Sequence, residues 1–249
     1  MQLVLKNGKT LSIPESEGRA RPQWSSETPY IEKFLNRARS KNFLPKTLSV
    51  KLECLSNLKE AIGGYSSYFE PLAGIGITAK LLEAYPTWTY LNEMDEECRK
   101  VLEVNFQGAA ISGTDSISNP EFGIAPDVTF LDFNNYTMRK WTDSIGLLEY
   151  AFRATKQAVI VNDCSVFHLR YGKKSFENYS RFLGVPVENH LEFFYAAKMW
   201  YAKRLEGWFL TNVEYNIETA FLLFKREDSG LRVNRVSPES VDAQVWARP

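Results

Sequence analysis

The stretch Ser67-Tyr-Phe-Glu-Pro-Leu-Ala-Gly-Ile-Gly-Ile-Thr-Ala-Lys80 decides the fold class of this chain of 249 residues. An apolar strand that ends near Pro71 leads into a corner with two glycines, Gly74 and Gly76, and then into a helical pattern. Glycine has no Cβ, so such a corner turns tightly and lets the backbone approach a ligand. The first amides of the following helix can receive a carboxylate or phosphate. The corner therefore predicts a strand–turn–helix unit with a ligand at its bend.

The glycine spacing alone is a common signal. Gly74-x-Gly76-x-x-Ala79 satisfies the loose dinucleotide fingerprint, in which the third position can be alanine. A glycine-containing turn between any strand and helix gives the same fragment. The surrounding pattern has to separate the two interpretations.

Strand and helix patterns alternate after residue 66, which predicts a doubly wound, mostly parallel α/β sheet. The apolar runs are typical of strands buried in a parallel sheet. Two later runs, 208–215 and 219–225, are close enough in sequence to pair only as an antiparallel hairpin that ends the sheet. Strands are expected at 67–71, 88–92, 109–112, 127–131 and 157–162, and helices at 77–85, 95–106 and about 142–155.

The region before the sheet is predicted to be a hairpin followed by helices, and it is mildly basic. Residues 3–13 alternate around Asn7-Gly8, which suits a type I′ turn. Prolines then open one helix from 28 to about 39 and another from 45 to about 62. We expect an extension at 1–65, a sheet domain at 66–227 with an insertion at about 166–207, and a tail at 228–249.

Composition excludes several classes of protein. Thirty Lys and Arg balance thirty Asp and Glu, so no global field draws the chain to nucleic acid or membrane. The three cysteines are too widely spaced for a disulfide framework or a zinc site, and His168 and His190 lack ligand spacing. With no long apolar run or signal-like start, we expect a soluble cytoplasmic protein without a bound metal.

Polar residues follow four consecutive predicted strands. Glu70 lies at the end of the first strand, Glu93 follows the second, Asp115 the third and Asp132 the fourth. Ligands of open α/β sheets bind at the carboxyl ends of the strands, so these side chains mark the expected site. Asp95, two residues beyond Glu93, is better suited to the start of the next helix.

The chain resembles the class I S-adenosylmethionine-dependent methyltransferases from residue 67 to about 165 and again from 208 to 225, where that family has its closing hairpin. A nicotinamide dehydrogenase would explain the glycine corner, but explains Glu70 and the hairpin less well. Four motifs carry the resemblance: Glu70-x-x-Ala73-Gly74-x-Gly76, Asn92-Glu93-Met94-Asp95, Thr114-Asp115-Ser116 and Asp127-Val-Thr-Phe-Leu-Asp132.

The resemblance implies S-adenosylmethionine as cofactor and a role for each motif. The loop 73–76 would run beside the methionine part of the cofactor, and Glu70 would help to position the amino group of that part. Glu93 would hold the ribose hydroxyls, Met94 would cover the adenine, and Asp115 would receive the exocyclic amine. Asp132 would lie close to the cofactor as well.

The fourth motif departs from the family. Nucleic-acid amino-methyltransferases carry Asn or Asp, two prolines and an aromatic residue, whereas this chain has Asp132-Phe133-Asn134-Asn135-Tyr136. Asp132 could still accept a hydrogen bond from a target amine, with Asn134 as a second candidate catalytic residue and Phe133 or Tyr136 stacking on a base. Alternatively, Asn134 or Asn135 caps a helix.

A cysteine offers a different chemistry. Cys164 follows the fifth strand, where some RNA cytosine-C5 methyltransferases place a nucleophile, and Asp132 matches an acidic residue of that group. Cys164 could equally be a small buried side chain, and Asp163 could be the active-site carboxylate.

Aromatic and basic residues interleave between the fifth strand and the hairpin. Lys173, Lys174 and Trp200 belong to this stretch, which suits base stacking together with phosphate contacts. The same pattern could be a packing helix with Trp200 buried. The sequence therefore predicts a methyltransferase that acts on a nucleic-acid base, DNA or RNA. Two alternatives remain. One is a small-molecule or protein methyltransferase, and the other is a catalytically inactive methyltransferase-like protein with a binding or structural role.

Overall fold

The computed structural model describes residues 2–5, 8–13, 44–82, 86–133, 137–163, 177, 180–181, 184–188, 192, 205–215 and 220–227. Two short strands come first, β1 (Gln2–Val4) and β2 (Thr10–Ser12), followed by the long helix α2 (Leu44–Ile62). The remaining elements are β3 (Ser67–Glu70), α3 (Ile77–Leu81), β4 (Trp88–Asn92), α4 (Glu96–Asn105), β5 (Ala110–Ser112), β6 (Val128–Leu131), α5 (Thr137–Ala154), β7 (Ala158–Asp163), β8 (Trp208–Tyr215) and β9 (Ala220–Arg226).

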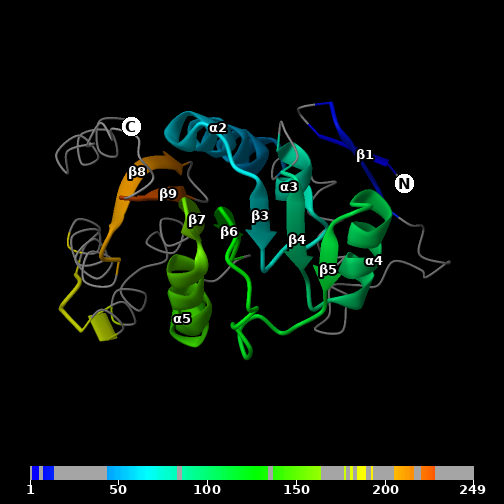
Figure 1. The fold of residues 1–249 in the computed structure, drawn as a ribbon. Helices are drawn as coiled ribbons and strands as arrows, with labels where there is room; N and C mark the ends of the chain where they lie inside the picture. Colours follow the sequence, from blue (N-terminus) through cyan, green and yellow to red (C-terminus); the bar gives the residue numbers. More distant parts are fainter. Residues whose placement is uncertain are drawn as a thin grey trace.

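The main sheet has seven strands in the order β5-β4-β3-β6-β7-β9-β8 (Figure 1). The first five strands in this order, β5, β4, β3, β6 and β7, run parallel to one another. Strand β9 runs antiparallel to both β7 and β8. The chain starts in the middle at β3, moves outward to β5 and then returns to β6. The order therefore reverses between β3 and β6, where ligands of open α/β sheets bind.

Alternating side chains build one core on each face of the sheet. Phe130 of β6 and Ile160 of β7 belong to the cluster that includes α2, α3 and α4. Their neighbours along the same strands, Leu131 and Val161, belong to the cluster around α5. Strands buried on both faces read as continuous apolar runs, which explains why the sequence pattern identified them.

The predicted α/β class and the closing antiparallel hairpin are confirmed. The expected strands lie within one or two residues of the observed ones. Helix α5 starts at Thr137, earlier than the expected 142, and α3 ends at Leu81 rather than 85. The expected helix at 28–39, most of the insertion and the tail lie outside the described residues.

The N-terminal hairpin and α2 share the core of the sheet. Leu11 of β2 and Leu58 of α2 are buried in the same cluster as the strands. Asn105 at the end of α4 binds the backbone of Ser12 through both its amide nitrogen and its oxygen, at 2.7 Å each. We therefore propose that the boundary expected at residue 65 is a division along the sequence rather than between separate cores.

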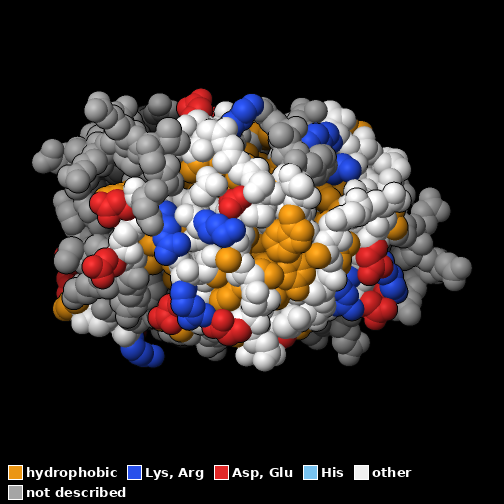
Figure 2. All heavy atoms as spheres, viewed as in Figure 1, with side chains coloured by type: hydrophobic (Ala, Val, Ile, Leu, Met, Phe, Trp, Pro, Cys, Tyr) orange, Lys and Arg blue, Asp and Glu red, His pale blue; other side chains and the backbone are white. Residues whose placement is uncertain are grey.

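Between β5 and β6 the described chain forms no helix, and aromatic side chains cover the adjoining sheet face instead. Figure 2 shows hydrophobic side chains gathered over the region of β3 and β4. Phe69 stacks on Tyr90 with ring centroids 5.3 Å apart, and Phe122 of the β5–β6 connection packs edge-on against both rings. In the described ranges, no helix combines the length and the apolar character needed to cross a membrane.

Candidate active site

The two glycines of the corner are required for different reasons. Both have left-handed backbone, with φ of 55° at Gly74 and 81° at Gly76. A Cβ on Gly76 would lie 2.3 Å from Phe106 and 2.8 Å from Leu102, so this glycine allows the corner to pack against α4 and the residue that follows it. A Cβ on Gly74 would meet nothing within 4 Å. The open space beside Gly74 is therefore the part of the corner that a ligand can enter.

Glu93 lies across this corner. One carboxylate oxygen accepts a hydrogen bond from the Gly74 amide at 2.8 Å, and the other accepts from the Asp95 amide at 2.9 Å. Burial raises the pKa of Glu93 above its ordinary value, and the backbone hydrogen bonds oppose that shift. The structure therefore places a partly buried carboxylate beside the open space at Gly74.

Asn92, at the end of β4, ties three strand ends together. Its amide nitrogen donates to the carbonyls of Pro71 and Thr114 and to Ser116 Oγ, and its oxygen accepts from the Thr114 amide. The Asn92 backbone carbonyl also accepts from the Ala73 amide at 2.9 Å. This side chain was not predicted as functional, although it directly precedes Glu93. It holds the carboxyl edge of the sheet in shape.

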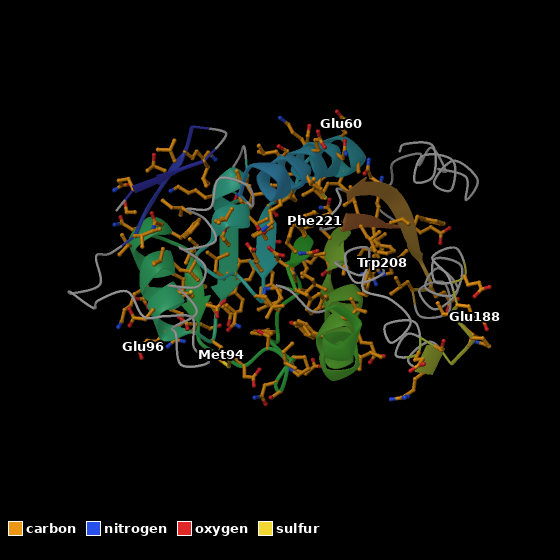
Figure 3. All side chains as sticks on the ribbon, turned by 180° about the vertical axis from the view of Figure 1, so that it is seen from behind. Glu60, Met94, Glu96, Glu188, Trp208 and Phe221 are labelled. Atoms are coloured by element: carbon orange, nitrogen blue, oxygen red, sulfur yellow. The ribbon has the colours of Figure 1, made fainter. Side chains whose placement is uncertain are left out.

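Met94 follows β4 and Asp115 follows β5. Met94 is 62% exposed and lies beside the start of α4 (Figure 3). Asp115 accepts from the Ile117 and Ser118 amides and from Ser118 Oγ, and these bonds lower its pKa. Asp115 thus closes a turn after β5. Asp95 caps α4 through the Cys98 amide, which is the role expected for it.

A buried polar cluster lies between the ends of β3 and β6. Glu70 is 1% exposed and accepts a hydrogen bond from Tyr68 Oη at 3.0 Å. A second hydrogen bond joins Glu70 to Thr78. Burial raises the pKa of Glu70 to about 8 and the nearby Asp132 adds to this, while Lys51 opposes it. Glu70 therefore takes up a proton at a higher pH than an ordinary carboxyl group does.

Asp132 is held in place from two sides. Lys51 of α2 forms an ion pair with Asp132 Oδ2 and donates to Thr78 Oγ1 at 3.1 Å. Asn162 of β7 donates to Asp132 Oδ1 at 2.6 Å. Lys51 and Asn162 were not predicted as site residues. The basic character of the N-terminal extension was visible in the sequence, but nothing local connects Lys51 to a residue 81 positions away.

The other predicted site residues divide into two groups. Phe133 is 7% exposed and packs in the cluster around α5, so its ring lies in the core and we do not carry it forward as a stacking surface. The side chain of Asp163 is outside the described part of the structure. So are the remaining predicted catalytic and substrate contacts, Asn134, Tyr136, Cys164, Lys173, Lys174 and Trp200. Among the described residues, no group of His, Cys, Asp and Glu could hold a metal ion.

The fold is similar to solved methyltransferase structures. The Escherichia coli protein yhhF, provisionally assigned as a methyltransferase, is 17% identical and has a TM-score of 0.52, with 91% of this chain and 99% of yhhF aligned. Trm1 from Pyrococcus horikoshii, solved with S-adenosyl-L-methionine, is 14% identical with a TM-score of 0.58; the alignment covers 92% of this chain but spans only 62% of Trm1. PH1948 from the same organism, provisionally assigned as an RNA methyltransferase, is 12% identical with a TM-score of 0.50 over 77% of this chain and 86% of its own. The chain matches no protein-family model and no curated protein sequence. These similarities establish the class I methyltransferase fold.

Proposed function

We propose that this chain transfers a methyl group from S-adenosylmethionine to an acceptor, and that the acceptor is a nucleic-acid base. The observation that carries the proposal is the arrangement of Glu93 beside the open space at Gly74. This arrangement lies at the carboxyl edge of a sheet with the class I methyltransferase order. A neutral or cationic ligand with a hydroxyl pair suits such a partly buried carboxylate.

The described residues fit the cofactor. Glu93 would accept hydrogen bonds from the ribose hydroxyls, and the exposed side chain of Met94 would cover the adenine. Asp115, already positioned by its turn, would receive the exocyclic amine. Glu70 would help to position the amino group of the methionine part, where its raised pKa lets it respond to an incoming cation by ionising.

Asp132 would orient the acceptor. When bound, S-adenosylmethionine would supply the methyl carbon. The lone pair of the acceptor would form the new bond to that carbon, and the electron pair of the broken carbon–sulfur bond would stay on sulfur. A carboxylate has about four lone-pair sites, and Lys51 and Asn162 occupy two on Asp132. Another can accept a hydrogen bond from the target amine and take up the proton that the methylated nitrogen loses.

The nucleic-acid acceptor is supported by the aromatic and basic insertion of the sequence. Base stacking with phosphate contacts is the usual combination for single strands. The zero net charge argues that such contacts are local rather than a property of the whole surface.

Replacing Glu93 tests the cofactor site. Glu93→Ala removes an acceptor of charge-assisted hydrogen bonds, and we expect affinity for S-adenosylhomocysteine to fall roughly 10- to 100-fold, about 1.5–3 kcal/mol. Calorimetry on the folded variant measures this. Glu96→Ala is the matched control, because Glu96 is an exposed carboxylate on the adjacent turn that pairs with Lys100. Equal affinity in both variants would remove Glu93 from the site.

Replacing two lysines of the insertion tests the acceptor. We expect the affinity of wild type for a single-stranded oligonucleotide to fall with salt, with a slope of about 0.7 per contacted phosphate. Lys173→Glu with Lys174→Glu should weaken binding and flatten that slope, because each substitution replaces a phosphate contact with a repulsive charge. The comparison is made where the melting temperature of the variant matches that of wild type. Lys100→Glu with Lys156→Glu is the control, since both lysines are at least half exposed and far apart in sequence. If wild type shows no salt-dependent binding to the oligonucleotide, that result would favour a small-molecule or protein acceptor.

A further inference from the structure

Lys51 is an unusual residue to find inside the fold. It lies on α2, before the first strand of the sheet, and is 7% exposed. Its ammonium nitrogen lies 5.9 Å from the centroid of the Phe130 ring and 5.8 Å from that of the Phe221 ring. Removing a lysine from water is costly, and a buried ion pair is often no more stabilising than apolar residues of similar size. The pair therefore calls for an explanation other than stability.

The geometry around Asp132 supplies that explanation. Lys51 binds one carboxylate oxygen and Asn162 binds the other, so the carboxylate plane is fixed from two elements that flank it. In the motif that this segment resembles, two prolines stiffen the chain after the acidic residue, and here Phe133 and Asn134 stand in their place. In this chain two side-chain contacts, from Lys51 and Asn162, hold the Asp132 carboxylate.

We infer that Lys51 is a positioning residue of the active site, which holds the carboxylate of Asp132 oriented toward the methyl acceptor. This inference rests on the proposed methyl transfer. It makes α2 a part of the catalytic machinery rather than only a cover for the sheet. Lys51 acts through Asp132 and does not itself touch the acceptor.

Charge balance in the cluster supports this role. Tyr68 and Glu70 from β3 interact electrostatically with Asp132, and Lys51 from α2 forms an ion pair with it. Burial and the nearby carboxyl groups raise the pKa of Tyr68, and burial raises the pKa of Glu70. Lys51 brings a positive charge into this cluster. Without it, only Asn162 of the two contacts described above would orient the Asp132 carboxylate.

Four variants test the inference: Lys51→Met, Lys51→Arg, Asp132→Asn, and Lys51→Met combined with Asp132→Asn. The activity probe is tritiated methyl transfer from S-adenosylmethionine to random-sequence RNA and DNA pools, measured at pH 7 where each variant is folded. For Lys51→Met we expect at least about 100-fold slower transfer, with S-adenosylhomocysteine affinity within about threefold. Lys51→Arg keeps a cation beside Asp132 and should restore most of the lost transfer rate.

Melting temperatures give a readout that needs no acceptor. Lys51→Met leaves a buried carboxylate without its cation and should lower the melting temperature by about 10 °C. The double variant should lose less than the sum of the two single losses, because it removes both charges.

The outcomes separate the inference from the proposed function. An unchanged transfer rate in Lys51→Met, or additive losses of melting temperature with normal S-adenosylhomocysteine binding, would overturn the role of Lys51 alone. A wild type that binds no S-adenosylhomocysteine would overturn the proposed function, and the role of Lys51 with it.

Discussion

Gly76→Ala is expected to destabilise the protein by about 2–5 kcal/mol, from left-handed strain of about 1–2 kcal/mol and overpacking of about 1–3 kcal/mol. The backbone φ of 81° disfavours any side chain, and the new Cβ would lie 2.3 Å from the Phe106 ring. Relief is difficult because Phe106 and Leu102 are themselves buried. Urea unfolding followed by circular dichroism measures the loss.

Gly74→Ala is the matched control on the same corner. Its φ of 55° also imposes strain, but its Cβ would meet nothing within 4 Å, so we expect a stability loss of only about 1–2 kcal/mol. Its main effect should be weaker S-adenosylhomocysteine binding, because the methyl group would enter the open space beside Glu93. Equal destabilisation by the two substitutions would contradict the division of roles between the glycines.

Asp132→Asn is expected to slow methyl transfer at least about 100-fold, with S-adenosylhomocysteine affinity nearly unchanged. The amide keeps the shape of the side chain but loses the charge that orients the acceptor amine, and that loss is confined to the transition state. Tritiated methyl transfer measures the rate and calorimetry measures the affinity. Asp132→Ala is a poorer test, because it leaves Lys51 with no acceptor at this position and endangers folding.

Cys164→Ser distinguishes amine chemistry from cytosine-C5 chemistry. If Asp132 orients an amine, the serine variant should transfer methyl groups at close to the wild-type rate. If Cys164→Ser is inactive while Asp132→Asn remains active, the amine mechanism is wrong, and the result would indicate attack by the Cys164 thiolate instead. Loss of cofactor affinity in Asp132→Asn would instead make Asp132 a cofactor contact.

The electrostatics of the cluster link these tests. Glu70, Asp132 and Lys51 lie within one buried network, so substitutions there will not combine additively. Glu93 and Gly74 form a separate contact on β4 and the corner. We therefore expect substitutions at Glu93 to change cofactor affinity without disturbing the ion pair between Lys51 and Asp132.

The sequence by itself determined the order of strands and helices, the closing hairpin and the polar strand ends. Each of these depends on local patterns: a buried parallel strand is an apolar run, a hairpin needs two runs close together, and a strand end is the residue after the run. Glu70, Glu93 and Asp132 could be found in this way because topology places the carboxyl ends of parallel strands along one edge.

The tertiary structure decided which of these side chains meet and what each glycine is for. Phe133 was expected at the substrate, but the α5 cluster buries its ring, because a side chain's direction after a strand depends on what packs there. Position 76 requires glycine because a Cβ there would clash with the ring of Phe106, thirty positions later in the chain. Lys51 reaches Asp132 across 81 positions, and Asn162 across 30. No local pattern carries such pairs, since packing of α2 on the sheet is what brings a lysine and a carboxylate into one buried site.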